Sequence, residues 1–197
     1  MNRIFLVDVE STGPSPANSV MTEFGVVDFE TRDSFHGHLW DFEPTPGNEA
    51  LPIAVRENYG YTASCPQAYP NSGFKTGQRF GFEEQIQPSW WLMKTLNTWM
   101  DLYTLGGRAV FVSDNPGWDF MWLAYEFDKA HIDNPFGHSS RRIGDFAAGL
   151  AGKWVQQTKW KSLRKTRHTH NPVDDAQGNA EALEVLLAKA ETGGCSV

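Results

Sequence analysis

Residues 3–13 read RIFLVDVESTG, a run of apolar and partly β-branched residues that leads into acidic residues and a turn signal. Such a run is typical of a buried β-strand. Asp8 and Glu10 lie two positions apart, so a strand points both carboxylates to the same face. Two like charges on a buried strand repel each other and resist the loss of water. Because Mg²⁺ takes oxygen ligands of this kind, the stretch predicts half of a metal site.

Length and composition indicate one globular domain over residues 1–197. The chain has 197 residues, of which 40% are hydrophobic and 21% are charged, enough for a substantial core. No apolar run approaches the length of a membrane span, so we expect no membrane contact. The formal net charge of −7 argues against a general electrostatic grip on nucleic acid. It is compatible with a nucleic-acid enzyme whose clustered carboxylates are offset by metal ions.

The two cysteines, Cys65 and Cys195, lie far apart and form no CxxC pair. A structural zinc site or a disulfide framework is therefore not expected. The first strand follows the N-terminus directly, so we expect no signal peptide, and a reducing cytoplasm is the default compartment.

The hydrophobic pattern predicts an α/β fold, a mixed sheet covered by helices. An antiparallel three-strand meander is expected to open the chain, and residues 41–87, rich in Pro and Gly in their first part, form a predicted loop-rich insertion. Further strands are expected over 20–29, 34–40 and 109–114, and helices over 88–105, over 118–130, from about 145 and from 172 to the glycines at 193–194.

Two predicted helices begin at an Asn-Pro pair, in which the asparagine can cap and the proline fits the first turn. Asn115 precedes the helix that carries Asp119 near its start. Asn171 precedes the last helix, where Asp174 falls in position to support the cap and Asp175 is left for another role. In open α/β sheets, ligand sites collect outside strand ends and near helix N-termini.

These residues resemble the DEDD exonuclease superfamily. Four short motifs carry the resemblance: DVESTG at 8–13, EFGV at 23–26, NPGWDF at 115–120 and HNPVDDA at 170–176. The last has a histidine five positions before its final aspartate, which marks the DEDDh, or DnaQ-like, branch. The resemblance implies a ribonuclease H-like fold with parallel strands beside the meander. Trp90-Trp91 and the segment 141–145 also resemble, less specifically, phage and bacterial exonucleases and exoribonuclease-like relatives.

The resemblance implies phosphodiester hydrolysis with two Mg²⁺ ions, for which Mn²⁺ can substitute. Asp8 would bridge both ions, and Glu10 and Asp175 would complete the first ion's ligands. Asp119 would act through an intervening water molecule. His170 would be the general base, because imidazole titrates near neutral pH.

The implied substrate is the 3′ end of single-stranded DNA or RNA. The main chain around Thr12 and Gly13 approaches the terminal nucleotide in the family, and a small residue at Gly13 permits that approach. Tryptophans at such positions are more often core than a stacking surface, but one of Trp90 and Trp91 should face out of its helix, where a base contact is the alternative. The expected substrate-contacting residues are Ser11, Thr12, Gly13, Trp90, Trp91 and Asn115.

Several residues keep a second interpretation. Asp174 could replace Asp175 as the ligand, and His168 could replace His170 as the base. His36 and His38 have zinc-like proximity on one strand face, but no third ligand is evident, so we interpret them as structural. The basic run over 159–167 is either a solvated face or a phosphate contact.

The choice between DNA and RNA also stays open, since it depends on contacts to the 2′-hydroxyl. The alternatives are an exoribonuclease specialised for RNA ends or short oligoribonucleotides, a non-catalytic nucleic-acid binder and a polymerase-associated proofreading subunit. Many relatives of this fold pair, so a homodimer is one expectation.

Overall fold

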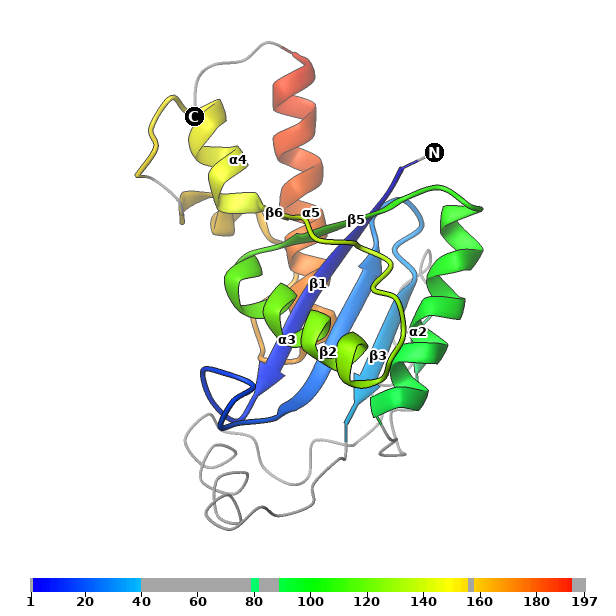
Figure 1. The fold of residues 1–197 in the computed structure, drawn as a ribbon. Helices are drawn as coiled ribbons and strands as arrows, with labels where there is room; N and C mark the ends of the chain where they lie inside the picture. The colour runs from blue at the N-terminus through cyan, green and yellow to red at the C-terminus, as the bar shows by residue number, and fades with distance from the viewer. Residues whose placement is uncertain (1, 40–78, 82–88, 156–157, 193–197) are drawn as a thin grey trace.

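The computed structural model describes residues 2–39, 79–81, 89–155 and 158–192 (Figure 1). The described residues form a six-stranded sheet with the order β4-β3-β2-β1-β5-β6. Its strands are β1 (Arg3–Ser11), β2 (Met21–Asp28), β3 (Ser34–His38), β4 (Arg79–Gly81), β5 (Ala109–Ser113) and β6 (Ser140–Arg142). The helices are α2 (Ser89–Thr104), α3 (Pro116–Lys129), α4 (Ile143–Leu150), the 3₁₀ helix η1 (Lys159–Leu163) and α5 (Pro172–Glu191).

The sheet is mixed, as the sequence predicts. β1 and β3 each pair antiparallel with β2, so the three-strand meander is confirmed. β5 lies parallel to β1 on its other side, and β6 lies parallel to β5. β1 therefore lies inside the sheet with a neighbour on each side, which is where a continuous apolar run is expected.

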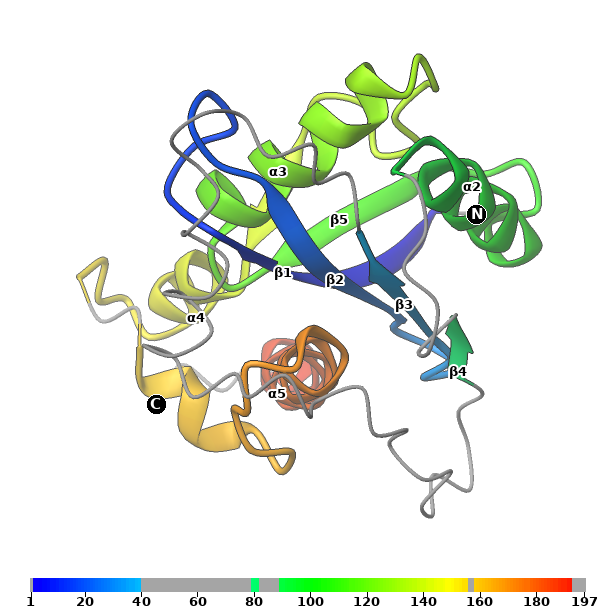
Figure 2. The ribbon, with the colours of Figure 1, turned by 90° about the horizontal axis from the view of Figure 1, so that it is seen from below.

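Helix α5 covers one face of the sheet, and α2 and α3 cover the other (Figure 2). Each face has its own apolar core. Phe5 packs on the face covered by α2 and α3. Leu6 packs on the opposite face, against residues of α5 such as Ala176. Because alternate residues of a strand share a face, Asp8 and Glu10 follow Leu6 onto the α5 side.

A glycine in β2 lets the start of α5 lie directly on the sheet. A Cβ atom at Gly25 would come within 2.4 Å of the Pro172 carbonyl group and 2.5 Å of the Val173 nitrogen. Any other residue would push the helix away. Gly25 pairs with Asp8 in the β1–β2 ladder. The close approach therefore brings the first turn of α5, which carries Asp175, next to Asp8.

Of the two asparagines predicted to cap a helix, one makes a side-chain cap bond. The Asn171 side chain accepts hydrogen bonds from the backbone nitrogens of Val173 and Asp174, so its predicted cap is confirmed. Asn115 occupies the N-cap position of α3 with Pro116 in the first turn, as predicted, but its side chain makes no cap bond. There the geometry is reversed: the Asn115 backbone N–H donates to Asp119 Oδ2 at 3.3 Å.

Element boundaries shift by about two residues at several ends. α3 begins at Pro116 rather than at 118, and α4 begins at Ile143 rather than near 145. β3 ends at His38 rather than at 40. The predicted insertion at 41–87 lies outside the described residues except for β4. No helix in the described ranges is both long and apolar enough to cross a membrane.

Candidate active site

Three carboxylates from two distant parts of the chain meet on the α5 side of the sheet. Asp8, Glu10 and Asp175 each offer an oxygen atom within 4.8 Å of the others. Asp8 and Glu10 come from β1, and Asp175 comes from the first turn of α5, where it is only 1% exposed. The structure therefore assembles the side chains that the sequence singled out as three of the four metal ligands.

Burial and mutual repulsion raise the pKa values of carboxyl groups in this cluster. Burial raises the pKa of Asp8 well above its ordinary value, and the charges of Asp119, Asp175 and Glu10 raise it further. Burial also raises the pKa of Glu10 to about 8, with added repulsion from Asp175. The fold thus holds carboxylates where they resist ionisation, which is the expected state of a cation site before the cation binds.

Asp119 lies beside this group, at the start of α3. Trp118 ties that helix to β1 because its indole nitrogen donates to the Val9 carbonyl at 3.3 Å. Burial raises the pKa of Asp119 to about 7, although the Ser113 hydroxyl and the backbone around Asn115 and Val9 offset part of this effect. Asp119 does not belong to the described group of oxygens within 4.8 Å of one another, yet its charge raises the pKa of Asp8 more than those of Asp175 and Glu10 do.

The segment before α5 supplies two histidines. His170 places Nδ1 3.6 Å from Glu10 Oε1, and its backbone has a φ of 60°, the left-handed region that few non-glycine residues adopt. His168 places Nδ1 2.7 Å from Asp175 Oδ2. Both alternatives for the base therefore lie at the acids, His170 beside Glu10 and His168 on Asp175.

The choice between Asp174 and Asp175 is clearer. Asp175 accepts hydrogen bonds from the backbone nitrogens of Thr169 at 3.0 Å and His170 at 3.1 Å. These bonds fix its carboxylate beside Asp8. Asp174 instead accepts from the Thr169 hydroxyl at 3.4 Å and is absent from the described carboxylate groups that could hold an ion.

The donor set fits divalent metal ions of the Mg²⁺ type. Asp8, Glu10 and Asp175 present only oxygen atoms, the ligands that such hard cations take. Their mutual repulsion and burial leave a concentrated negative potential that a divalent ion would neutralise. These residues therefore satisfy the chemical requirement for the metal that the resemblance implies.

The predicted nucleotide-contacting turn is held together by its own bonds. The Ser11 hydroxyl donates to the Gly13 carbonyl at 2.9 Å, and Thr12 exchanges backbone and hydroxyl bonds with Val20. A Cβ atom at Gly13 would lie 2.3 Å from the Ser19 hydroxyl oxygen. A side chain at position 13 would therefore displace the Ser19 hydroxyl.

The remaining predicted contacts lie at different distances from the acids. Asn115 is joined to Asp119 through its backbone, so it lies at the site. Trp90 is 55% exposed, and Trp91 packs against the core on the α2 and α3 face. One tryptophan thus faces out as expected, but α2 covers the face of the sheet opposite the acids, and the structure does not bring either ring to them.

A buried cluster next to the acids was not recognised as a unit from sequence. Glu23 Oε2 lies 3.1 Å from His36 Nε2, and Glu23 Oε1 lies 2.8 Å from His38 Nε2. Although burial opposes ionisation, the two imidazoles hold the pKa of Glu23 down at about 2. The third member of the cluster is Glu23, with which both imidazoles pair. Strand pairing could have revealed it only with the β2–β3 register known.

Two residues of the basic run, Lys161 and Arg164, form ion pairs with Asp114 of the same chain. Lys161 Nζ lies 2.5 Å from Asp114 Oδ2, and Arg164 lies 3.6 Å from the same oxygen. Arg164 also donates to Asn179 of α5 and lowers the pKa of Asp8 through its charge. These two residues fix η1 and α5 to the end of β5, close to the acids.

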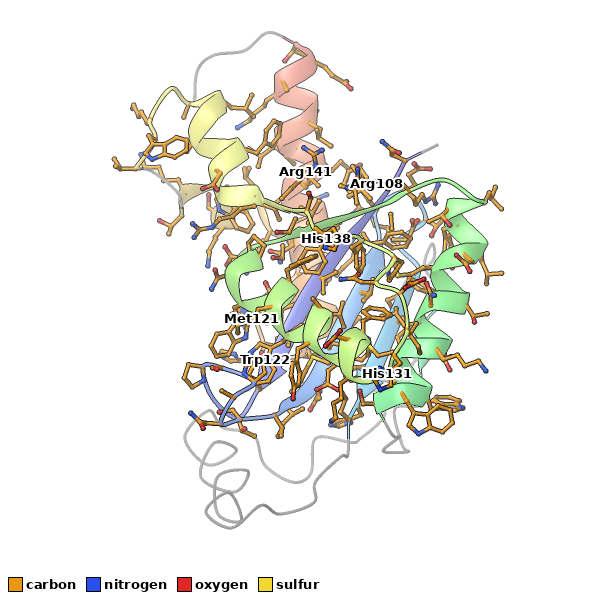
Figure 3. All side chains as sticks on the ribbon, viewed as in Figure 1. Arg108, Met121, Trp122, His131, His138 and Arg141 are labelled. Atoms are coloured by element: carbon orange, nitrogen blue, oxygen red, sulfur yellow. The ribbon has the colours of Figure 1, made fainter. Side chains whose placement is uncertain are left out.

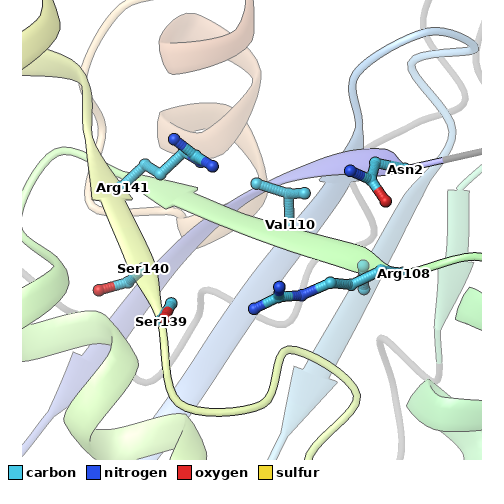
Figure 4. Close-up of a pocket in the computed structure, with 7 residues that line it drawn as sticks. Asn2, Arg108, Val110, Ser139, Ser140 and Arg141 are labelled. Carbon is cyan, nitrogen blue, oxygen red and sulfur yellow. The ribbon is translucent and has the colours of Figure 1, made fainter.

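A pocket with a different character lies at the other end of the sheet (Figure 3, Figure 4). Asn2 and Arg108, which precede β1 and β5, line it together with Ser140 and Arg141. Asn2 lies eight positions before Glu10, about 25 Å of extended chain, whereas Arg141 lies across β5 from Leu6. No acid of the site lines this pocket.

Comparisons with known proteins agree on the fold. No protein-family model and no curated protein sequence matches this chain. Among solved structures, the nuclease domain of 3'hExo, a DEDDh family member bound to rAMP, is similar over 99% of this chain and 94% of its own, with a TM-score of 0.62 and 16% identity.

Two further structures show the same likeness. A full-length 3'-exonuclease is similar over 95% of this chain and 82% of its own, with a TM-score of 0.62 and 16% identity. E. coli exonuclease I in complex with a dA16 oligonucleotide is similar over 96% of this chain, with a TM-score of 0.52 and 13% identity. The match spans 41% of the exonuclease I chain. The chain therefore has the fold of the DEDDh exonucleases, and the predicted fold class is confirmed.

Proposed function

We propose that this protein is a divalent-metal-dependent 3′–5′ exonuclease that hydrolyses phosphodiester bonds at the 3′ ends of single-stranded nucleic acid. The observation that carries the proposal is the meeting of Asp8, Glu10 and Asp175 beside His170, although β1 and α5 are more than 150 residues apart in the chain. The similar structures include nucleases bound to rAMP and to a dA16 oligonucleotide, which supports the proposed substrate class.

Asp8, Glu10 and Asp175 would hold the metal ions. Divalent ions in such a site stabilise the charge on both the attacking and the leaving oxygen of an in-line displacement. The two backbone N–H groups that bond Asp175 keep its carboxylate oriented toward Asp8. Asp119 adds negative potential behind this group, as its effect on the pKa of Asp8 indicates.

His170 is the proposed general base. Its side chain is 41% exposed, so the imidazole reaches solvent while lying 3.6 Å from Glu10. It would accept a proton from the attacking water at a ring nitrogen. The left-handed backbone at His170 aims the ring toward β1 and is maintained by the hydrogen bond from its own N–H to Asp175.

One gel tests the proposal. Single-stranded DNA and RNA, labelled at the 5′ end, are incubated with the protein in Mg²⁺ or in chelator. Shortening one nucleotide at a time from the 3′ end, only with Mg²⁺, is the expected result. Intact substrates of both kinds in Mg²⁺ and Mn²⁺ would contradict it.

The same gel separates the alternatives. Degradation of RNA alone would identify an exoribonuclease. Equal rates on DNA and RNA would indicate an exonuclease that acts on both. Substrates that stay intact but shift in a binding assay would indicate a non-catalytic nucleic-acid binder. Substrates blocked at the 3′ hydroxyl by phosphate give the matched control for end dependence.

A further inference from the structure

The side chains of His168, His170 and Asp175 form a second donor set beside the carboxylates. Their ligand atoms lie within 4.8 Å of one another. The two imidazole rings have centroids 4.4 Å apart, with 58° between their planes. This set differs chemically from Asp8, Glu10 and Asp175 because it offers two nitrogens and one oxygen. We propose that His168, His170 and Asp175 bind Zn²⁺, and that this ion inhibits the enzyme.

The donor atoms favour zinc over magnesium. Imidazole nitrogen suits Zn²⁺ and related transition metals, whereas Mg²⁺ takes oxygen ligands. Zinc sites with three protein ligands and an open fourth position commonly use two histidines and a carboxylate. The side chains of His168 and His170 are 54% and 41% exposed, so an ion can enter from solvent and keep water in the fourth position.

Each distance between two donor atoms, at most 4.8 Å now, needs to change by no more than about 1.5 Å to admit the ion. With metal–ligand distances of about 2.0–2.2 Å, tetrahedral ligand atoms lie about 3.3–3.5 Å apart. His168 Nδ1 now lies 2.7 Å from Asp175 Oδ2, so this exposed imidazole would move outward by less than an ångström. Asp175 would stay in place because the backbone nitrogens of Thr169 and His170 already bond its two oxygens.

The other histidine pair shows why the site is expected here. His36 and His38 also have a carboxylate, Glu23, but each imidazole bonds a different oxygen of it. Their donor atoms do not form one of the described groups within 4.8 Å, and their side chains are only 11% and 23% exposed. That cluster is closed, whereas the cluster at His168 faces solvent.

Inhibition follows from the residues that the two sites share. Zinc would occupy the lone pair of His170 that the proposed base needs, and it would engage Asp175, which the carboxylate site also uses. The inhibitory consequence therefore rests on the proposed exonuclease, but zinc binding does not.

Zinc binding is measured by calorimetry without nucleic acid, in excess Mg²⁺. The wild type and Asp8→Asn are expected to bind one Zn²⁺ with similar affinity, since Asp8 belongs only to the carboxylate site. His168→Gln is expected to bind it at least about 10–100-fold more weakly. His138→Gln, at an exposed histidine outside both clusters, is the matched control.

Equal zinc affinity in the wild type and His168→Gln, or loss of binding in Asp8→Asn alone, would overturn the site. If His168→Gln fails to fold, the wild type decides by NMR: Zn²⁺ should shift the imidazole signals of His168 and His170 and leave those of His36 and His38 in place. Shifts confined to the other histidines would also overturn it.

Nuclease assays then test the consequence. Zn²⁺ added to the Mg²⁺-loaded wild type should lower the rate, and His168→Gln, normalised to its own rate in Mg²⁺, should need at least about ten times more Zn²⁺ for the same inhibition. Zinc binding without any nucleolysis in Mg²⁺ would overturn the proposed function and leave the zinc site standing.

Discussion

Glu10 and Glu23 lie directly opposite each other across the β1–β2 pair, yet their surroundings act on them in opposite directions. Burial raises the pKa of Glu10 to about 8, and the neighbouring carboxylates add to the effect. Glu23 is also buried, but hydrogen bonds from His36 and His38 lower its pKa to about 2. The same residue type on the same face of the sheet is thus held neutral in one place and charged in the other.

The difference lies in where the compensating charge comes from. The Glu23 cluster contains its own donors, so it is complete within the fold and serves packing between β2 and β3. Around Glu10 the carboxylates outweigh the nearby donors, since the pKa values of Asp8 and Glu10 stay raised although His170 lies 3.6 Å from Glu10. A divalent cation would favour the ionised form of both acids. A closed cluster stabilises the protein, whereas an open one can bind metal ions and act on a substrate.

The largest expected effect on exonuclease activity comes from removing Asp175, one of the proposed metal ligands. Asp175→Asn should reduce exonuclease activity to the level of buffer, because it removes one of three oxygen donors and leaves its buried amide among carboxylates. Asp174→Asn, one position away, should keep most of the activity. Gel assays of both variants check this contrast, and an inactive Asp174→Asn with an active Asp175→Asn would reverse the ligand assignment.

The next effect concerns His170. His170→Ala should lower kcat by about 10²–10⁴-fold, the usual range for loss of a general base, while substrate affinity changes little. Single-turnover kinetics with a separate binding measurement distinguish the two quantities. A fully active His170→Ala would remove this residue from the mechanism and return His168 as the candidate base.

Glu10→Gln and Glu23→Gln should have different effects on the free energy of unfolding. Glu23→Gln should destabilise the metal-free protein by about 1–3 kcal/mol, because His36 and His38 lose a charged acceptor in a buried place. Glu10→Gln at pH 8 should leave stability unchanged or raise it, since it removes a repelled carboxylate. Chemical denaturation measures both, and equal losses in the two variants would show that the clusters do not differ as described.

The pH dependence of stability gives a smaller effect with a definite sign. The pKa of Glu10 rises from 4.5 to about 8 on folding, so its contribution is complete below about pH 4.5 and is lost as pH rises through 8. Asp119, raised to about 7, acts in the same direction. The metal-free protein should therefore become less stable between about pH 5 and 8, and Mg²⁺ should reverse the loss.

Glu23 affects the stability of the protein at acidic pH. Its lowered pKa gives stability that is present above about pH 4.5 and is lost as pH falls toward 2. Thermal melting from pH 2 to pH 8, with and without Mg²⁺, separates the two groups. Mg²⁺ should change the melting temperature at the alkaline end alone, and an equal change at both ends would contradict the assignment.

Local patterns were enough to predict the parts of the site that depend on local geometry. The two-residue spacing of Asp8 and Glu10 fixes their common face on any strand. The cap at Asn171 fixes where α5 begins and therefore where Asp175 points. The motif resemblance links these separate parts and predicts the DEDDh fold, which the similar solved structures confirm.

Contacts that depend on register or on loop conformation were not predictable in this way. Glu23 contacts His36 and His38 only through the register of the β2–β3 pairing, which the predicted meander leaves undefined. Equally, no spacing rule reveals that His168 bonds Asp175, because the turn at His170 uses a left-handed backbone that single-sequence propensities do not anticipate.

Divalent ions should displace protons from the acids around Asp8. Calorimetric titration of Mg²⁺ or Mn²⁺ into the protein at pH 7, in buffers with different ionisation enthalpies, measures this exchange. Because Glu10 and Asp119 have raised pKa values, metal binding should release protons, and Asp8→Asn should abolish both binding and release. Absence of binding in the wild type, or unchanged binding in Asp8→Asn, would contradict the account.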